Sequence, residues 1–446
     1  MKLLNLDELI ELGFSEATKA GVDDASILGG QSVERMIRFS NNNITVSKDI
    51  DNIFLTAYVT KGKRRIIGST SNPIQRSLKS FIKNLVDTCA SLEPTKSYTQ
   101  LPNGPFRYKS GKNFDIKIRD NAIDLIGLTK QAIDQGLNAG AERVSGTLTS
   151  NHGRQLIRTS AGVQGENQST SLTINVRAFA DDSASGHGLS CSSNTRKFDA
   201  EDAGRTAGEY AKRSIGAKVA KDGIYDLILA PTVTADIVQH VGSFASAFSV
   251  ETGSSFLANK MGQTVATDSF TLRDYGLIKN GLGGHVFDDE GVPTKETTII
   301  NKGVLESYLH NSATAATFNT KTTGNAGLIS PHPWNLVVDK GSLDTEEMVS
   351  QVKMGMFITN NWYTRFQNLR GGEYSTVPRD AAFLIEKGEI KYPISGMRIS
   401  DTIPRQLLNI KELSEERKWI EWWEVNVPIL APYMLLKDVP ITCAVR

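Results

Sequence analysis

Histidine and cysteine are the side chains of this chain best suited to binding a transition metal, and their spacing limits that chemistry. No two histidines stand three or four residues apart, the spacing that places two ligands on one face of a helix. Cys89, Cys191 and Cys443 are three scattered thiols without a CxxC pair, which indicates neither a disulfide framework nor a zinc ribbon. The six histidines are His152, His187, His240, His285, His310 and His332.

The chemically most suggestive segment is residues 231–248, which we expect to form an amphipathic helix opened by Pro231. Proline is favourable at the first helical position because its missing N–H would be unpaired there. This helix carries an amide, an imidazole and a phenyl ring at Gln239, His240 and Phe244. A lone histidine beside glutamine is usually a hydrogen-bonded structural residue, and the alternative for His240 is a general base.

Motifs of several other chemistries are missing from the sequence. No GxSxG elbow, P-loop or GxGxxG after a strand occurs. Residues 288–291 lack the alternating oxygen ligands of a calcium loop, so we predict a polar turn there. The glycine-rich segment 323–327 makes a weak phosphate cradle, because no helix start follows it. We expect its Gly324 and Asn325 to place backbone groups close to a peptide or a partner.

An aromatic cluster stands near the C-terminus. Trp419, Trp422 and Trp423 are three of the five tryptophans and fall within five positions. Packing in the core or between subunits is one interpretation. Tryptophan is also frequent among the residues that dominate binding interfaces, so an interface or groove is the other.

The elements that position these residues begin with a weak internal duplication. Each copy is predicted to fold as a helix, several strands and a closing helix, with the closing helices at 72–92 and 199–215. Alternating residues at 53–59 and 171–179 indicate strands with one buried face. The matched anchors, in chain order, are 20–23 with 139–142, 38–40 with 158–160, and 71–72 with 193–194.

The second half of the chain has the pattern of a β-rich domain. Hairpins are predicted at 297–308 and 381–394, the first around a tight Asn-Lys-Gly turn. Helices are predicted at 345–357 and 407–419. The fold class is therefore α+β, a duplicated N-terminal α/β module followed by a β-rich C-terminal domain.

Domain limits follow from composition shifts. Residues 94–112 contain Pro, Gly, Ser and Tyr without periodicity, which is typical of a linker. We therefore predict a first N-terminal domain at 1–95, a second, repeat-like domain at 113–220 and the C-terminal domain at 221–446.

Charge and hydropathy point to a cytoplasmic protein without nucleic-acid or membrane partners. The 446 residues carry a formal net charge of +1, so no basic field favours nucleic acid. No apolar run approaches the roughly 18 residues that span a bilayer. The N-terminus predicts an amphipathic helix with acidic positions and not a signal peptide.

The order of several segments resembles the TldD/PmbA (TldD/TldE) peptidase family. The resemblance covers nearly the whole chain and is strongest over residues 225–395. It is carried in the C-terminal half by 287–294, 303–311, 323–327 and 383–394, and more loosely in the N-terminal half by 38–42 and 68–72.

The resemblance implies that this chain lacks the zinc site of the catalytic branch. Catalytic members carry His-Glu-x-x-x-His where this chain has Gln239, His240 and Phe244. An amide and a phenyl ring cannot replace two imidazoles around zinc. Catalytic members also take a ligand from a C-terminal Cys, and residues 401–432 contain none. We interpret Cys443, in the predicted last strand, as a small buried hydrophobe.

The resemblance further implies a non-catalytic subunit of a complex that degrades unstructured peptides, with a TldD-like catalytic homologue as partner and zinc only in that partner. A homodimer or heterodimer is expected. Two alternatives stay open: an active metallopeptidase with atypical ligands such as His240, and a homodimeric peptide-binding or regulatory protein without protease activity. The family's motif also requires a locally distorted helix, because residues five apart differ by roughly 140° in azimuth. Gly242 would permit that distortion.

Overall fold

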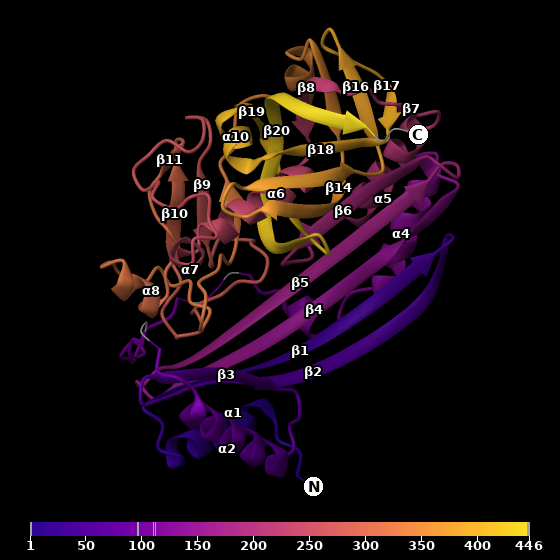
Figure 1. Ribbon diagram of the computed structural model, residues 1–446. Coiled ribbons are helices and arrows are strands. Elements are labelled where there is room, and N and C mark those ends of the chain that lie inside the picture. The colour runs from indigo at the N-terminus through magenta and orange to yellow at the C-terminus, as the bar shows by residue number, and fades with distance from the viewer. Residues whose placement is uncertain (1, 96–97, 110, 112, 444–446) are drawn as a thin grey trace.

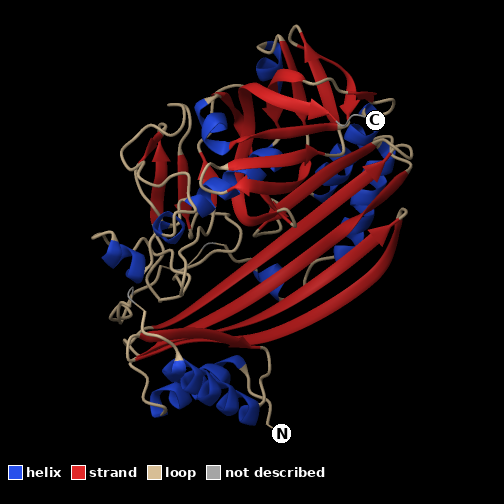
Figure 2. Cartoon of the chain, viewed as in Figure 1, coloured by secondary structure: helices blue, strands red, loops and turns tan. Residues whose placement is uncertain are grey.

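The computed structural model describes residues 2–95, 98–109, 111 and 113–443 (Figure 1). Helices and strands are mixed throughout, and the C-terminal half is mainly strand, which confirms the predicted α+β class (Figure 2). Long strands of the N-terminal half form one extended sheet, and the C-terminal half packs against one end of it.

Each N-terminal copy folds as a helix, three strands and a helix, as the duplication predicts. The first copy contains α1 (Leu6–Lys19), β1 (Asp24–Ser40), β2 (Asn43–Lys61), β3 (Arg64–Thr70) and α2 (Gln75–Ser91). The second contains α4 (Leu125–Asn138), β4 (Arg143–Thr159), β5 (Gln164–Phe179), β6 (Ser185–Ser192) and α5 (Ala200–Arg213), and the short α3 (Ile116–Arg119) precedes it.

The sequence anchors of the duplication occupy equivalent places in the two copies. Gly21 and Gly140 each follow the first helix of their copy with a φ of 67° and 107°, in the left-handed region that favours glycine. Residues 71–72 and 193–194 each follow the third strand. The repeat is therefore one of structure as well as of short motifs.

Both copies contribute to a single six-stranded sheet of order β3-β2-β1-β4-β5-β6. Its two central strands pair antiparallel, from Ser26 opposite Thr159 to Phe39 opposite Gly146. Burial follows this pairing, because Phe39 of β1 belongs to the core of the second copy. The segments predicted as separate domains at 1–95 and 113–220 therefore share one sheet.

The C-terminal region forms a fourteen-stranded sheet around one long central strand, β20 (Val425–Cys443). Its first elements are β7 (Lys218–Val219), β8 (Gly223–Leu229), α6 (Pro231–Phe244), α7 (Ala247–Glu251), β9 (Leu272–Tyr275), β10 (Glu296–Asn301), β11 (Val304–Leu305), α8 (Ser312–Thr317), β12 (Leu336–Val338), α9 (Thr345–Ser350) and β13 (Met354–Ile358). The others are β14 (Asn361–Asn368), β15 (Glu373–Pro378), β16 (Ala382–Glu386), β17 (Glu389–Ser395), β18 (Met397–Thr402), α10 (Ile403–Leu408) and β19 (Ile410–Trp422).

Two predicted helices differ from the structure. Of the helix predicted at 345–357, only 345–350 is helical, as α9, and 354–357 belong to β13. The helix predicted at 407–419 is wrong. Residues 407–419 end α10 and then form most of β19, which pairs with β20 over much of its length. The charged run within this segment suits one exposed face of a strand as well as it suits a helix. Tertiary pairing with β20 decides between the two, which periodicity over so short a segment cannot do.

Candidate functional site

Helix α6 lies in the middle of the C-terminal core. Pro231 occupies its first turn, as expected, and eleven of its fourteen residues are buried. The helix continues through Gly242 to Phe244 without interruption. A Cβ at Gly242 would stand 2.5 Å from Cδ1 of Leu336, so glycine is required here because β12 approaches the helix closely. The conformational freedom that we expected to distort the helix instead permits its packing.

The side chain of Gln239 is buried, and its polar atoms bind within the protein. Its Nε2 donates to Oδ1 of Asp236 at 2.9 Å and to the backbone oxygen of Glu424 at 2.7 Å. Its Oε1 accepts from the backbone N–H of Asn426 at 3.1 Å. The amide therefore ties α6 to the turn between β19 and β20.

A second polar group on α6, Asp236, is 1% exposed and fully hydrogen-bonded. Its Oδ2 accepts from Nδ2 of Asn361 at 2.5 Å and from the hydroxyl of Thr364 at 2.6 Å. Thr364 also bonds to the hydroxyl of Thr376 at 2.8 Å. Buried carboxylates require such donors, because an unsatisfied one costs several kcal/mol. This network joins α6 to the β14–β15 hairpin.

His240 and Phe244 contact the same ring. The His240 imidazole lies edge-on to Phe366 with centroids 4.8 Å apart, and Phe244 lies edge-on to Phe366 at 5.3 Å. Phe244 also packs on Phe256 at 5.0 Å. The His240 side chain is 26% exposed, and burial lowers its pKa while Asp236, 3.9 Å away, opposes that shift. His240 thus lies in an aromatic cluster beside a carboxylate.

These residues do not fit a zinc ion. Zinc sites in proteins need imidazole, thiolate or carboxylate ligands, usually three or four. Gln239 has both polar atoms engaged, the Phe244 ring has no lone pair to donate, and Asp236 is surrounded by donors. Across the residues that the structure describes, no three His, Cys, Asp or Glu side chains group as a metal site. Cys443 ends β20, as predicted, but is half-buried, with its N–H donating to Asp222.

The tryptophan cluster lies where β19 turns into β20. Trp422 is 9% exposed, and its ring lies 4.7 Å from that of His187 of β6 at a tilt of 33°, so it packs the C-terminal region against the second N-terminal copy. Trp423 is 60% exposed and lies edge-on to Trp422 at 5.4 Å. Next to this turn, the backbone N–H of Tyr363 donates to Glu424 Oε1 at 3.0 Å. Trp422 therefore follows the packing interpretation, and an interface role for the exposed Trp423 stays a prediction.

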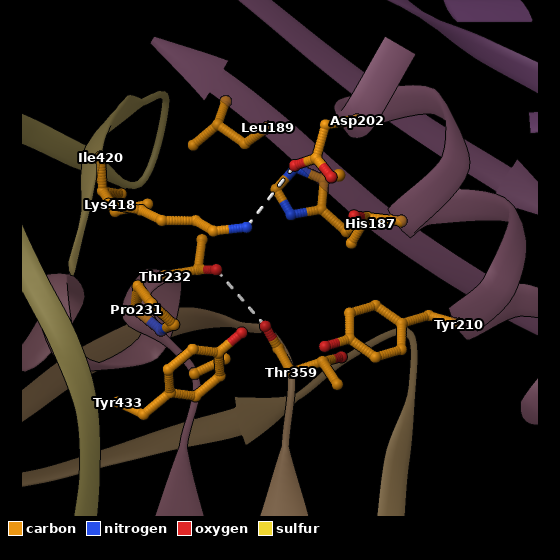
Figure 3. Close-up of a pocket in the computed structure, with 13 residues that line it drawn as sticks. His187, Leu189, Asp202, Tyr210, Pro231, Thr232, Thr359, Lys418, Ile420 and Tyr433 are labelled. Carbon is orange, nitrogen blue, oxygen red and sulfur yellow. Dashed lines mark hydrogen bonds and ion pairs between the residues drawn. The ribbon is translucent and has the colours of Figure 1, made fainter. Parts of the chain in front are cut away.

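Two pockets follow the boundary between the second copy and the C-terminal region. The smaller, about 40 Å³, reaches the start of α6 at Pro231 and Thr232 (Figure 3). There, Lys418 points toward Asp202, with Nζ and Oδ2 3.5 Å apart. The larger, about 420 Å³, shares Lys418 and Asp202 and is also lined by Trp419. The two neighbouring pockets thus extend from the start of α6 to Trp419.

Gly324 and Asn325 lie in another part of the C-terminal region, near β9. Asn325 is 1% exposed, and its Nδ2 donates to Asp274 at 2.6 Å, a carboxyl whose pKa burial raises to about 7. The oxygen of Gly324 accepts from the indole N–H of Trp334 at 2.8 Å. Both therefore bind other parts of this chain. Asp288 Oδ1 accepts from the N–H groups of residues 290 and 292, so 288–291 is the expected polar turn.

Sequence reasoning missed the partners of α6. Asp236 stands among apolar residues on a buried helix, and an acid in that setting signals a polar partner elsewhere. Asn361, Thr364 and Glu424 carry no such signal, because they come from hairpins far away in sequence.

Among the described residues, no helix has the length and apolar content needed to cross a bilayer.

Comparisons with known proteins agree with this architecture. The model of the PmbA/TldA metallopeptidase C-terminal domain matches residues 222–443, and that of the central domain matches 119–215. A metalloprotease of Methanothermobacter thermautotrophicus is 28% identical over 48% of this chain and 47% of its own length. The metalloprotease PmbA of Escherichia coli O157:H7 is 26% identical over 69% of each chain. The chain thus aligns with about half to two thirds of these relatives.

Solved structures share the fold along the whole chain. A putative modulator of a DNA gyrase from Thermotoga maritima has a TM-score of 0.85 at 22% identity and covers 98% of this chain and 100% of its own. TldE from Thermococcus kodakarensis has a TM-score of 0.82 at 17% identity, covering 98% and 99%. With both domain models matched in order and this fold, the chain belongs to the PmbA/TldD metallopeptidase family.

Proposed function

We propose that this chain is the non-catalytic subunit of a cytoplasmic peptidase complex that degrades unstructured peptides. The observation that carries the proposal is that the side chains of Gln239 and Phe244 on α6 are engaged in contacts within the protein. Gln239 binds Asp236, Glu424 and Asn426, and Phe244 packs between two other phenyl rings. These side chains stabilise the fold where a catalytic member needs metal ligands, so the hydrolytic step belongs to a partner of the same family with His-Glu-x-x-x-His.

The face next to α6 suits a peptide without sequence preference. Trp423 and Tyr363 are 60% and 53% exposed, and the His240 side chain of α6 is 26% exposed. Strand β14 pairs with β15 on one side, and within the described chain no strand pairs with its other side. An extended peptide can add to such an edge through backbone hydrogen bonds, and aromatic side chains supply contact area that tolerates many sequences.

Co-purification tests the proposal directly. The tagged chain is co-expressed with a His-Glu-x-x-x-His homologue from the same genome, and complexes are resolved by native mass spectrometry. We expect a heterodimer with zinc in the homologue, an interface of at least about 2,000 Å², and chelator-sensitive cleavage of an unfolded peptide by the complex. The chain alone should not cleave the peptide.

Two results would replace the proposal. Chelator-sensitive cleavage by the chain alone, abolished by His240→Ala, would favour a metallopeptidase with atypical ligands. A stable homodimer that captures no catalytic homologue would favour a free-standing peptide-binding protein. In either case the contacts of Gln239 would stabilise the fold without indicating a non-catalytic subunit.

A further inference from the structure

The larger of the two boundary pockets has the size and composition of a ligand site. Its volume of about 420 Å³ falls within the roughly 300–1,000 Å³ typical of small-molecule sites. The walls come from β6, the start of α5, the loop after β9, and β19 with β20. A pocket assembled from elements this far apart in sequence keeps its shape only while the second N-terminal copy and the C-terminal region stay packed together.

Positive charge predominates around this pocket. Four basic side chains line it, and two acidic ones, Asp199 and Asp202, which leaves an excess of two positive charges. Asp202 pairs with Lys418 at 3.5 Å. Asp199 caps α5 by accepting from the backbone N–H of Asp202 at 2.8 Å. The acids are therefore already engaged within the protein.

The other three cations have no such partner. Within the part of the chain that the structure describes, Lys197, Lys279 and Arg417 make no ion pair. The two lysines are exposed, and Arg417 is half-buried. One of its nitrogens donates to the oxygen of Val338 at 2.9 Å, which leaves most of the five N–H donors of a guanidinium free. Burial lowers the Arg417 pKa, and so does the nearby Arg273, although Asp339 opposes this. An anion would relieve that repulsion.

An apolar wall stands beside these cations. Trp419 is half-buried and lines the pocket together with Leu189 and Leu430. A free phosphate would use the charges but not this wall, and a hydrocarbon would use the wall but not the charges. A carboxylate adjacent to an apolar side chain uses both, and the planar fork of arginine matches a carboxylate in a bidentate manner.

We propose that this pocket binds the carboxylate end of a peptide, with Arg417, Lys197 and Lys279 facing the carboxylate and Trp419 packing on the last side chain. The inference rests on the proposed function, because it names the part of the peptide that this subunit holds. The pocket shares Lys418 and Asp202 with the smaller pocket that reaches Pro231 of α6. Peptide anchored here would therefore lie along the boundary that leads to α6.

Calorimetry on the intact chain tests the pocket. The probes are acetyl-Ala-Ala-Leu as the free acid, the same peptide as its amide, and acetyl-Ala-Glu-Leu amide, whose carboxylate lies on a side chain. We expect the free acid to bind at least about tenfold more tightly than either amide, because a charge-assisted hydrogen bond is lost without the terminal carboxylate. Quenching of Trp419 fluorescence, absent in Trp419→Phe, should report the same order.

Variants locate the effect. Lys197→Gln with Lys279→Gln changes exposed residues only and should remove most of the preference for the free acid. Arg417→Gln should remove the rest. Lys130→Gln, on the exposed face of α4, is the matched control and should change nothing.

Three outcomes would overturn the proposal: equal affinity for acid and amides, tighter binding of the side-chain carboxylate, or a preference unchanged in the lysine variant. None of these would affect capture of a catalytic homologue, which tests the proposed function separately. A chain that shows the preference but captures no homologue would keep the pocket and lose the subunit role.

Discussion

The side-chain amide of Gln239 donates a 2.7 Å hydrogen bond to the backbone oxygen of Glu424, 185 positions further along the chain. This bond connects α6 to the turn that carries the exposed Trp423. A glutamine here is therefore a structural connection between two parts of the C-terminal region.

Removing that connection should destabilise the protein. Gln239→Ala removes a donor from the buried carboxylate of Asp236 and from the backbone oxygen of Glu424, and a buried group left unsatisfied costs about 1–3 kcal/mol. We expect a loss of about 1–3 kcal/mol in the free energy of unfolding, measured by urea denaturation. Gln131→Ala on the exposed face of α4 should stay within about 0.5 kcal/mol. Equal midpoints for the two variants would contradict the structural role.

Phe244 should contribute mainly through packing. It is 7% exposed and contacts Phe256 and Phe366. Phe244→Ala should cost about 3–5 kcal/mol, and Phe244→Leu, which keeps most of the volume, considerably less. Thermal unfolding measures both. A melting temperature that Phe244→Ala leaves unchanged would mean that the ring is exposed in solution and that this surface binds something else.

Restoring the family motif should not restore a metal site. The triple variant Gln239→His, His240→Glu and Phe244→His supplies two imidazoles, but residues 401–432 contain no Cys to complete the set. We expect less than stoichiometric zinc by mass spectrometry and no chelator-sensitive proteolysis. The catalytic homologue, purified in the same way, is the positive control. Robust proteolysis by the triple variant would reveal a third ligand elsewhere.

His187 should make stability depend on pH in a defined window. Burial lowers its pKa from 6.5 to about 4; Asp380 opposes this shift, and Arg177 and Arg379 add to it. The unfolded chain therefore binds a proton near pH 6.5 that the folded chain does not. Stability is unaffected above that pH and falls as pH drops toward 4, by about 1.4 kcal/mol per pH unit within this window.

The contribution of His187 is isolated by difference. His187→Gln keeps an amide near Asn175, which bonds to the imidazole at 3.1 Å, and cannot titrate. Urea unfolding of both proteins at pH 7, 6 and 5, followed by tryptophan fluorescence, should show the wild type losing stability relative to the variant as pH falls. A constant difference across this range would contradict a buried neutral imidazole.

Local sequence patterns predicted helices and strands better than they predicted the tertiary contacts between them. Alternation identified the strands at 53–59 and 171–179, because one face of the six-stranded sheet is buried, and Pro231 marked the start of α6. The segment 407–419 was wrong because pairing with β20 overrides a weak helical pattern. The loop at Asn325 looked open because of its glycines, yet Asp274 requires its amide as a buried donor.

For the candidate site, the sequence predicted which residues belong to it but not how they are arranged. The motif positions Gln239, His240 and Phe244 could be assigned from the sequence, but the groups that bind them could not. The β14–β15 hairpin and residues 424 and 426, where β19 turns into β20, reach α6 through the fold and not through any local signal. The same holds for Trp419 and Trp422, which lie against the second N-terminal copy.

The pairing of β1 with β4 sets an order of events during synthesis. β1 is synthesised before β4, so Ser26 has no partner until Thr159 is made, and Phe39 has none until Gly146 is made. The centre of the sheet can therefore form only after β4 has been synthesised. At roughly 5–20 residues per second, that delay is on the order of ten seconds. Throughout it the growing chain exposes the inner edge of β1, a row of unpaired backbone groups open to wrong partners. The unpaired edge of β1 is therefore a property of the growing chain only, because β4 covers this edge in the folded protein.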